Sequence, residues 1–420
     1  MRLTNGVAAR TATFILAGGE GRRLSPLTKY RPKPLVPFGG CYRIVDFTLS
    51  NCLNSALKRV HVLTQHASES IGTYLRKGWG RAGGSNGEFV LHTPAISGKR
   101  YAGTADAVLQ NFHLMEQYQC EFALVLSADH IYTMDYRDLL NFHVASGAEV
   151  TIATVDRPKE CSTDVGVLEV ENGDRVIGFE EKPRHPRTGP KSNGMISASM
   201  GIYVFNRDVL WAALTGGRRI IDFANDLIPE LIGSREVRAY RHEDWTGKTP
   251  LYWRDVGTPE AYYASSMDLL AYDPSIDPQN ADWPVRSGDR AQPGTRSGFS
   301  AVGSGLEVNS IIPDGANIGP TSVYHSVLFP SVVLKPGAIV RHSVLMPGVV
   351  IGRGASVRRA IIDANVVIDA GDDIGYDAVR DRRRFHVLSN GIVVVSPDHV
   401  LPFRKRDTIH RVPHSWVQAS

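Results

Sequence analysis

The stretch FILAGGEGRRLSPLTKYRPKP, residues 14–34, changes from apolar to glycine-rich to basic. The apolar run Phe14–Ala17 predicts a buried strand, and the glycines that follow it allow a backbone to approach a polyphosphate and direct its N–H groups at the oxygens. The cations beyond them suit the charge that develops on a pyrophosphate leaving group. We therefore interpret the stretch as a nucleotide-binding loop, made of Gly18, Gly19, Gly21 and the basic residues Arg22, Arg23, Lys29, Arg31 and Lys33.

Two common glycine motifs do not fit this loop. The dinucleotide-binding pattern GxGxxG fails because Leu24 stands where its third glycine belongs, and the triplet at Gly247 lacks the earlier glycine of a P-loop. Glycines alone would indicate no more than a tight turn. Their combination with Arg23 and Lys33 is what favours phosphate binding.

The first part of the chain alternates short β-rich runs with helical patterns, which predicts an α/β fold with a mainly parallel sheet. Ligands of such sheets bind at the carboxyl ends of the strands. We therefore place the active site in the loops after Ala17, Thr64 and Leu126. Strands are expected at 14–17, 59–64, 122–126, 149–155 and 176–180, and helices at 68–75, 103–118 and 136–146.

A change of texture divides the chain. Residues 273–300 are rich in Pro, Gly and Asp and lose all periodicity, which indicates a linker between domains at 1–272 and 301–420. In the second domain aliphatic residues recur every six positions, as in Val327, Val333 and Ile339. This period favours a three-sided parallel β-helix over an antiparallel sandwich of short strands. Breaks in the period near 318–327 and 357–362 indicate short insertions or a skipped corner.

Composition excludes several classes of protein. Forty-seven basic and 43 acidic residues give a net charge of +4, too balanced for a nucleic-acid-binding protein, although a pI near 8.8 suits anionic ligands. No stretch is long and apolar enough for a membrane span or a signal segment, so we expect a cytoplasmic protein. Four cysteines without metal-ligand spacing are expected to be reduced and buried: Cys41, Cys52, Cys120 and Cys161.

Acidic and basic residues follow other predicted strands. Asp129 comes just past the strand 122–126, where a carboxylate suits Mg²⁺, although a turn or helix cap is an equal alternative. Asp255 precedes a helical pattern, with the same alternative. After the strand 176–180, Lys182 could bind a sugar phosphate and Glu181 could accept from hydroxyls. A surface ion pair is the other interpretation of that pair.

The pattern GGxGxRLxxLTxxxxKP resembles the opening of the sugar-phosphate nucleotidyltransferases. Six further blocks resemble the ADP-glucose pyrophosphorylases among them: FGGCYRIVDFTLSNCLNS (38–55), YAGTADAV (101–108), SADHIYTMDY (127–136), FEEKP (179–183), SASMGIYVF (197–205) and YWRDVGT (252–258). The resemblance implies a Rossmann-like nucleotidyltransferase domain followed by a left-handed parallel β-helix. It also implies adenylyl transfer from ATP to glucose 1-phosphate for α-glucan synthesis, with Mg²⁺ as cofactor.

The resemblance also implies roles for individual residues. It makes Asp129 and Asp255 the metal pair, Lys33 the catalytic lysine and Arg23 the group that stabilises the departing pyrophosphate. The sugar phosphate is expected to contact Tyr101, Gly166, Glu181, Lys182 and Ser199. The sugar phosphate itself attacks the α-phosphorus, so no covalent nucleophile is needed.

Regulation is where the sequence departs from the family pattern. The family is allosteric and tetrameric, which implies a homotetramer that responds to anionic metabolites through Lys29, Arg31 and Arg43. Tyr30 stands where relatives usually carry a cation tied to effector binding. Two alternatives stay open: a uridylyl- or thymidylyltransferase, with His342 as an acyltransferase residue of the β-helix, and a catalytically silent regulatory homologue.

Overall fold

The computed structural model describes residues 4–80, 82, 89–95, 100–171, 173–187, 193–243, 251–289, 295–302 and 305–399. The chain forms two compact units and passes repeatedly between them. The first unit comprises residues 1–19, 48–68 and 79–253, and the second comprises residues 20–47, 69–78 and 254–420.

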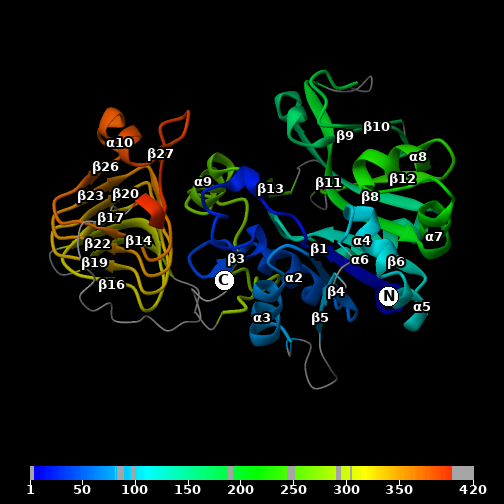
Figure 1. The fold of residues 1–420 in the computed structure, drawn as a ribbon, viewed down its shortest axis with the longest axis horizontal. Helices are drawn as coiled ribbons and strands as arrows, with labels where there is room; N and C mark the ends of the chain where they lie inside the picture. Colours follow the sequence, from blue (N-terminus) through cyan, green and yellow to red (C-terminus); the bar gives the residue numbers. More distant parts are fainter. Residues whose placement is uncertain are drawn as a thin grey trace. The chain divides into compact units, whose positions relative to one another are not determined.

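The first unit is built on a nine-stranded sheet (Figure 1). Its strands β5, β4, β1 and β6 are parallel neighbours, and β11 joins β6 antiparallel. The central strands are buried along almost their whole length, as is typical of parallel strands covered on both faces. The strands are β1 (Thr11–Leu16), β4 (Val60–Thr64), β5 (Val90–Pro94), β6 (Phe122–Ser127), β8 (Val150–Pro158), β9 (Gly166–Val170), β10 (Val176–Glu181), β11 (Met195–Asn206) and β12 (Val237–Arg241).

Helices pack on this sheet around one hydrophobic core. The helix predicted at 103–118 is interrupted, so that α4 and α5 stand in its place. The interruption falls at Asn111, whose amide donates to the Ala107 carbonyl at 2.8 Å and to the Tyr101 hydroxyl at 3.1 Å. Such local side-chain bonds compete with a regular helix. The helices are α1 (Thr4–Ala9), α4 (Thr104–Gln110), α5 (His113–Gln117), α6 (Tyr136–Ala145), α7 (Arg207–Thr215) and α8 (Ile228–Ile232), while α2 (Ile44–Asn54) and α3 (Ser68–Gly78) cross the unit boundary.

The second unit combines the basic part of the glycine stretch with the C-terminal repeat. Two short 3-10 turns, η1 (Arg22–Leu24) and η2 (Lys33–Leu35), and the strands β2 (Pro37–Phe38) and β3 (Tyr42–Arg43) form its N-terminal part. Helix α9 (Pro259–Asp268) joins this part to the repeat. Its Tyr262 hydroxyl donates to the Pro37 carbonyl at 2.6 Å, and its Tyr263 hydroxyl donates to the His342 carbonyl at 2.6 Å.

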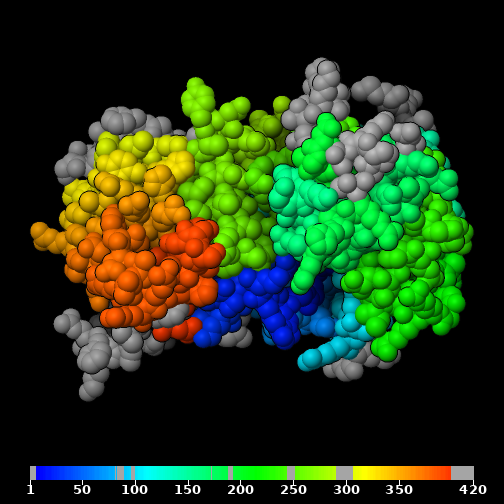
Figure 2. Space-filling model, turned by 90° about the horizontal axis from the view of Figure 1, so that it is seen from above, coloured from blue at the N-terminus to red at the C-terminus, as the bar shows by residue number. Residues whose placement is uncertain are grey.

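The repeat is a parallel β-helix, as predicted, with three short strands in each coil (Figure 1). Figure 2 shows the coils, yellow to orange, as a continuous packed surface. The strands are β14 (Thr295–Val302), β15 (Gly305–Ile312), β16 (Asn317–Ile318), β17 (Ser322–Tyr324), β18 (Val327–Leu328), β19 (Val333–Leu334), β20 (Ile339–Arg341), β21 (Val344–Leu345), β22 (Val350–Ile351), β23 (Ser356–Arg358), β24 (Ala360–Ile362), β25 (Val367–Ile368), β26 (Asp373–Ile374), β27 (His386–Val387) and β28 (Val393–Val395), with the helix α10 (Ala378–Arg384).

Each central coil takes 17 residues, because Ser322 pairs with Ile339 and Ile339 pairs with Ser356. The inward side chains follow repeated steps of five, six and six residues: Val323, Leu328, Leu334, Val340, Leu345, Ile351, Val357, Ile362, Ile368 and Ile374. The break near 357–362 is therefore the regular five-residue step of a coil and needs no insertion. A strict period of six wrongly takes Val333 and Ile339 as core, since both are only half-buried.

Left-handed residues occur at the corners of the β-helix, among them Ser331 (φ 63°) and Gly337 (φ 78°). At the corner of the five-residue step they are His325, His342 and Arg359, with φ of 45°, 45° and 48°. Buried serines satisfy the backbone there: the Ser343 N–H donates to the Ser326 hydroxyl at 3.1 Å.

Two further expectations concern whole-chain properties. Cys41, Cys52 and Cys120 are buried and unbridged, as predicted, whereas Cys161 is half-exposed. Burial raises the pKa of the Cys41 thiol to about 12, which makes it unreactive. Among the described residues, no helix has the length and apolar character needed to cross a membrane.

Candidate functional site

The glycine loop begins at the carboxyl end of β1. Leu16 pairs with Leu63 of β4 and with Ser127 of β6, so three parallel strands end at the same level. The residues that follow these strands are therefore neighbours on one edge of the sheet. A Cβ added to Gly18 would lie 3.6 Å from the Cβ of Gln65, while Gly19 has open space around it. This edge thus leaves room for a ligand beside the bare backbone.

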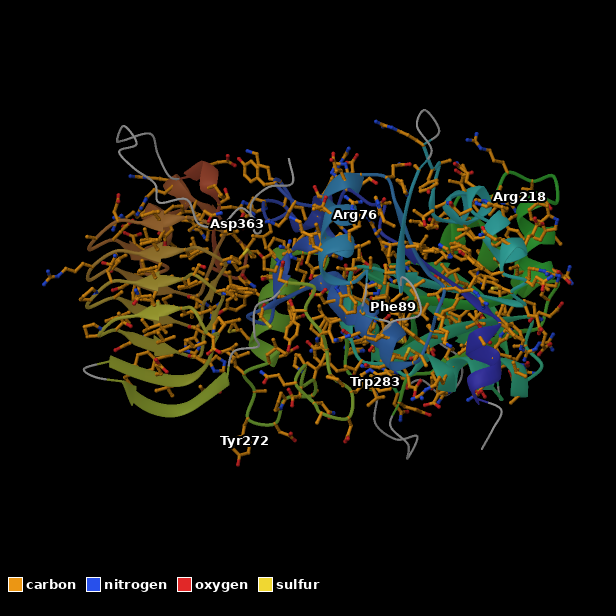
Figure 3. The ribbon with its side chains drawn as sticks, turned by 90° about the horizontal axis from the view of Figure 1, so that it is seen from below. Arg76, Phe89, Arg218, Tyr272, Trp283 and Asp363 are labelled. Atoms are coloured by element: carbon orange, nitrogen blue, oxygen red, sulfur yellow. The ribbon has the colours of Figure 1, made fainter. Side chains whose placement is uncertain are left out.

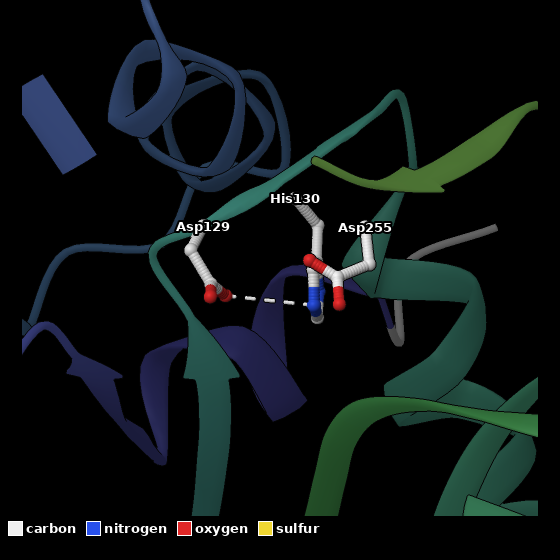
Figure 4. Close-up of side chains that lie close together, drawn as sticks. All are labelled: Asp129, His130 and Asp255. Carbon is white, nitrogen blue, oxygen red and sulfur yellow. Dashed lines mark ion pairs between the residues drawn. The ribbon is translucent and has the colours of Figure 1, made fainter. Parts of the chain in front are cut away.

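Asp129 lies on this edge, where β6 leads into β7 (His130–Tyr132). The Ser127 hydroxyl donates to its Oδ1, and the Nε2 of His130 lies 3.4 Å from the same oxygen (Figure 4). The side chain of Asp129 is 32% exposed, so its carboxylate is held from within the protein and open to a ligand.

His130 is fixed by its own packing. The ring of Trp253 meets it edge-on with centroids 4.9 Å apart, and a Cβ on Gly201 would lie 3.6 Å from its Cε1. Its Nδ1 is buried and has no hydrogen-bond partner among the described residues. The ring therefore presents Nε2 to Asp129. Trp253 begins β13 (Trp253–Asp255), which carries the chain on to Asp255.

A second polar group lies at the end of β10, also in the first unit. Lys182 pairs with Glu181 at 2.6 Å, and its φ of 48° turns the chain away from the strand. Glu181 is in register with Gly166 of β9. A Cβ there would lie 2.5 Å from the Phe179 ring and 3.0 Å from Oε2 of Glu181. Only glycine fits this position, and the structure brings these three predicted residues together.

Tyr101 and Ser199 are the other two residues predicted to contact the sugar phosphate. Both are buried, at 8% and 7% exposure. The Tyr101 hydroxyl accepts a hydrogen bond from the Asn111 amide, and the backbone N–H of Tyr101 donates to Gln65. Burial raises the pKa of the Tyr101 phenol. The Ser199 hydroxyl accepts from the Gly201 N–H at 3.2 Å. Burial also raises the pKa of the Tyr203 phenol.

The cations of the glycine stretch gather in the second unit. Lys33 is buried, at 6% side-chain exposure, and its Nζ lies 2.9 Å from Oδ1 of Asp255. Arg23 is exposed, and its Nη2 lies 3.4 Å from the other oxygen of Asp255. Gly21 has a φ of 64°, and a Cβ there would lie 2.8 Å from the Cβ of Lys33. The loop therefore needs a glycine at this position to bring Lys33 in.

The donor set fits a hard divalent cation. Asp129, His130 and Asp255 offer the kinds of atoms that hold metal ions, and the two carboxylates are the ligands that Mg²⁺ prefers. Imidazole is more typical of transition metals. By their chemistry, the carboxylates rather than His130 suit a hard divalent cation.

The predicted effector cations are engaged in ion pairs. Lys29 pairs with Asp398 at 2.6 Å, Arg31 with the buried Asp363 at 2.6 Å, and Arg43 with Asp289 at 2.8 Å. Figure 3 marks Asp363 on the β-helix. Tyr30 also donates to Asp398. In the run 380–384, Arg380 and Arg384 both pair with Asp372. The sequence singled out these cations without their acidic partners.

Sequence reasoning missed the residues that hold Asp129. Ser127 and His130 stand in the quoted block SADHIYTMDY but received no role. The signal was their position, since residues that flank a carboxylate at a strand end can reach its oxygens.

Two family models match the chain. Residues 12–271 match the family model "Nucleotidyl transferase", and residues 299–395 match "GlmU-like, C-terminal hexapeptide". Glucose-1-phosphate adenylyltransferase 2 of Alkalilimnicola ehrlichii is 39% identical over 94% of this chain and 96% of its own length. The proteins of that name from Vibrio cholerae and Vibrio parahaemolyticus are 41% and 44% identical over 92% and 91% of this chain, and 97% of their own lengths.

Proposed function

The chain belongs to the glucose-1-phosphate adenylyltransferases of the nucleotidyl transferase family, and from this premise we propose that it joins ATP and glucose 1-phosphate into ADP-glucose and pyrophosphate. The observation that carries the proposal is the buried Lys33 beside Asp255, directly after a glycine loop. Burying a cation beside a carboxylate is costly, so this pair is weak evidence for a role in stability. Its place after the glycine loop favours a role in binding a polyphosphate.

In the proposed reaction a phosphate oxygen of glucose 1-phosphate attacks the α-phosphorus of ATP. A new P–O bond forms, and the bond between the α-phosphorus and the bridging oxygen breaks, so that pyrophosphate leaves with the electron pair. Lys33 and Arg23 neutralise the charge that gathers on the phosphates, and the glycine loop supplies backbone N–H groups. A divalent cation held by Asp129 and Asp255 would add charge neutralisation. His130 and Ser127 keep the Asp129 carboxylate oriented.

The sugar phosphate is proposed to bind at the end of β10. Lys182 exchanges its ion pair with Glu181 for the phosphate, and Glu181 then accepts from sugar hydroxyls. Gly166 keeps the space clear, while Tyr101 and Ser199 supply hydroxyls. The two substrates thus use different groups of residues.

The test is an assay of the purified chain with glucose 1-phosphate, Mg²⁺ and each nucleoside triphosphate in turn, following pyrophosphate. We expect release with ATP and little with UTP or dTTP. Preference for UTP or dTTP would assign another sugar nucleotide, and silence with every triphosphate would indicate a regulatory homologue.

Assembly, location and regulation are also proposed. A homotetramer in the cytoplasm, activated by anionic metabolites through Lys29, Arg31 and Arg43, agrees with the chain's family. The ion pairs of these cations add a condition: an anionic effector has to displace Asp398 from Lys29 before it can bind. The domain division at 272 and 300 is proposed on the same basis, although β14 already begins at Thr295.

A further inference from the structure

Three buried polar side chains share one side of α2 and the residue after it, and we call them the polar face: Thr48, Asn51 and Ser55. The Ser55 N–H donates to the Asn51 carbonyl at 2.9 Å, so Ser55 continues the helical spacing. Steps of three and four residues place side chains on the same side of a helix. All three are fully buried, where a helix packed on a core normally carries apolar residues. Buried polar groups need hydrogen-bond partners, so the partners of the polar face indicate its role.

The partners are backbone groups of the segment 127–136, which connects β6 to α6 and contains Asp129. This segment includes β7, which belongs to a separate two-stranded sheet rather than to the nine-stranded one. Its backbone groups therefore need partners outside the large sheet. Four of them bond to the polar face: the carbonyls of Ser127 and Tyr132 and the N–H groups of Met134 and Tyr136. All of these residues belong to the first unit.

Asn51 is the central member of the polar face, and it uses both ends of its amide. Its Nδ2 donates to the Tyr132 carbonyl at 3.2 Å, and its Oδ1 accepts from the Met134 N–H at 3.1 Å. The side chain thus bonds to the segment on either side of Thr133, as a neighbouring strand would. An amide offers a donor and an acceptor on one planar group, and glutamine would hold them one methylene farther from the helix.

Thr48 and Ser55 bond to the two ends of the segment. The Thr48 hydroxyl donates to the Ser127 carbonyl at 3.0 Å, where β6 ends. The Ser55 hydroxyl accepts from the Tyr136 N–H at 2.8 Å, where α6 begins. The polar face therefore holds the segment both where it leaves the sheet and where it enters the next helix.

Asp129 lies in the part of the segment that is held on both sides. The bonded carbonyls of Ser127 and Tyr132 enclose Asp129 and His130 (Figure 4). A short stretch between two fixed points has few conformations available to it. Positions matter at such a site, because a displacement of about 1 Å can lower a rate by about 10²-fold.

We propose that Asn51, supported by Thr48 and Ser55, is a positioning residue for the adenylyl transfer. It acts through the backbone of residues 127–136 and sets the place of the Asp129 carboxylate. This inference rests on the proposed function. Residues that orient metal ligands commonly change metal affinity or activity by ~10–100-fold. The loss of Asn51 should therefore appear in metal affinity and kcat rather than in the KM for glucose 1-phosphate.

The experiment is Asn51→Leu, which keeps a branched side chain of similar size and removes both bonds. We expect kcat to fall at least ~10-fold and the affinity of the substrate-free chain for Mn²⁺, measured by its paramagnetic signal, to fall at least ~5-fold. The KM for glucose 1-phosphate should stay within ~2-fold.

The matched control is Leu49→Ala on the same helix. Two residues turn a helix by ~200°, so Leu49 lies on the opposite side from Asn51. Leu49 is fully buried, and its truncation should lower the urea midpoint of unfolding. It should nevertheless leave kcat and Mn²⁺ affinity within ~2-fold of the wild type, as for a change outside the site.

A second pair of variants decides the question if Asn51→Leu does not fold. Thr48→Val removes the hydroxyl and keeps the shape of the side chain, whereas Thr48→Ser keeps the hydroxyl. Thr48→Val should lower both kcat and Mn²⁺ affinity at least ~3-fold, and Thr48→Ser should stay within ~2-fold of the wild type, since only the first loses the bond to Ser127.

The positioning role would be overturned by unchanged kcat and Mn²⁺ affinity in folded Asn51→Leu. Equal losses in Leu49→Ala would reduce the effect to general stability, and equal losses in Thr48→Val and Thr48→Ser would exclude the hydroxyl bond. A wild type that releases no pyrophosphate would refute the proposed function instead. In that case the Mn²⁺ affinity of Asn51→Leu would still decide whether Asn51 positions Asp129.

Discussion

Ser127 and His130 both contact the same oxygen of Asp129. A substitution can therefore remove the charge of this side chain without moving it. Asp129→Asn keeps the shape of the side chain but removes the charge, so we expect kcat to fall at least ~10²-fold, as for other losses of one transition-state contact. The KM for glucose 1-phosphate should change little. The affinity of the substrate-free protein for Mn²⁺, measured by its paramagnetic signal, should fall as well. Asp174→Asn, at a half-buried bend with a φ of 73°, serves as the control.

Near-normal turnover of Asp129→Asn at saturating Mg²⁺ would remove this residue from the mechanism. A loss of turnover with full Mn²⁺ affinity would instead assign Asp129 a role other than metal binding.

Lys182 belongs to the other group of residues, and its contact with a phosphate would exist in both the ground and the transition state. Losing such a contact mainly raises KM. Lys182→Ala should raise the KM for glucose 1-phosphate at least tenfold and leave that for ATP within a few-fold, in initial-rate measurements. Lys159→Ala, an exposed lysine on the same unit, should change neither. If the ATP constant rose instead, the two ends of the site would be exchanged.

At the residue scale, motifs predicted candidate site residues and left out the side chains that contact them. Asp129, Lys33 and Lys182 stand in recognisable blocks, because each follows a strand or a glycine loop. The side chains that contact candidate site residues, His130 beside Asp129 and Asn111 beside Tyr101, have no special spacing, and their contacts depend on rotamers and packing. Position alone did not reveal that Nε2 of His130 would face Asp129.

At the scale of elements, strand positions were predictable and helix continuity was not. The runs at 59–64 and 122–126 became β4 and β6 with shifts of one residue, because buried parallel strands are plain apolar runs. The helix at 103–118 kept its periodicity in the sequence, yet the side-chain bonds of Asn111 interrupt it. In the β-helix, the step of five residues was hidden by aliphatic residues that alternate between inside and outside.

The buried serines Ser326 and Ser343 lie at the left-handed corner of the β-helix, and we call them the serine ladder. Their contribution to stability can be tested. Ser326 is fully buried, its hydroxyl donates to the Tyr324 carbonyl at 2.7 Å, and it accepts from the Ser343 N–H. Ser326→Ala leaves that N–H without its partner, which should lower the free energy of unfolding by ~1–3 kcal/mol. Ser322→Ala, on the outward side of the same coil, should cost less than ~0.5 kcal/mol. Urea unfolding measures both, and equal effects would contradict the role given to the ladder.

At the scale of the whole molecule, contacts between distant parts of the sequence were beyond prediction. The family resemblance fixed two folds and their order, and a period indicated the second of them. Neither of them could show that Asp398 contacts Lys29 and Tyr30, or that the buried Asp363 pairs with Arg31. Each of these pairs joins residues more than 300 positions apart, and no local pattern records such a pairing.

That contact changes the expected response to effectors. Asp398 supplies the negative charge that an anionic effector would bring, and Tyr30 donates a second bond to it where relatives carry a cation. An anionic effector proposed to bind Lys29 would therefore compete with the carboxylate of Asp398, and position 30 would offer it no positive charge. Coupling energies in allosteric enzymes are typically ~1–3 kcal/mol, so the loss of one charge-assisted contact can remove much of the response.

We expect activation by a phosphorylated or carboxylate metabolite of central carbon metabolism, with fructose 1,6-bisphosphate weaker than in relatives that carry Lys or Arg at position 30. Tyr30→Lys should strengthen the response to the bisphosphate, because a second cation then faces Asp398 and the effector. Asp398→Asn should do the same by releasing Lys29, whereas Tyr30→Phe, which removes only the hydroxyl, should have a smaller effect. The measurement is initial rate at sub-saturating ATP against glycolytic intermediates, AMP and phosphate. A wild type indifferent to every compound would exclude an effector site, and an unchanged bisphosphate response in both Tyr30→Lys and Asp398→Asn would exclude this one.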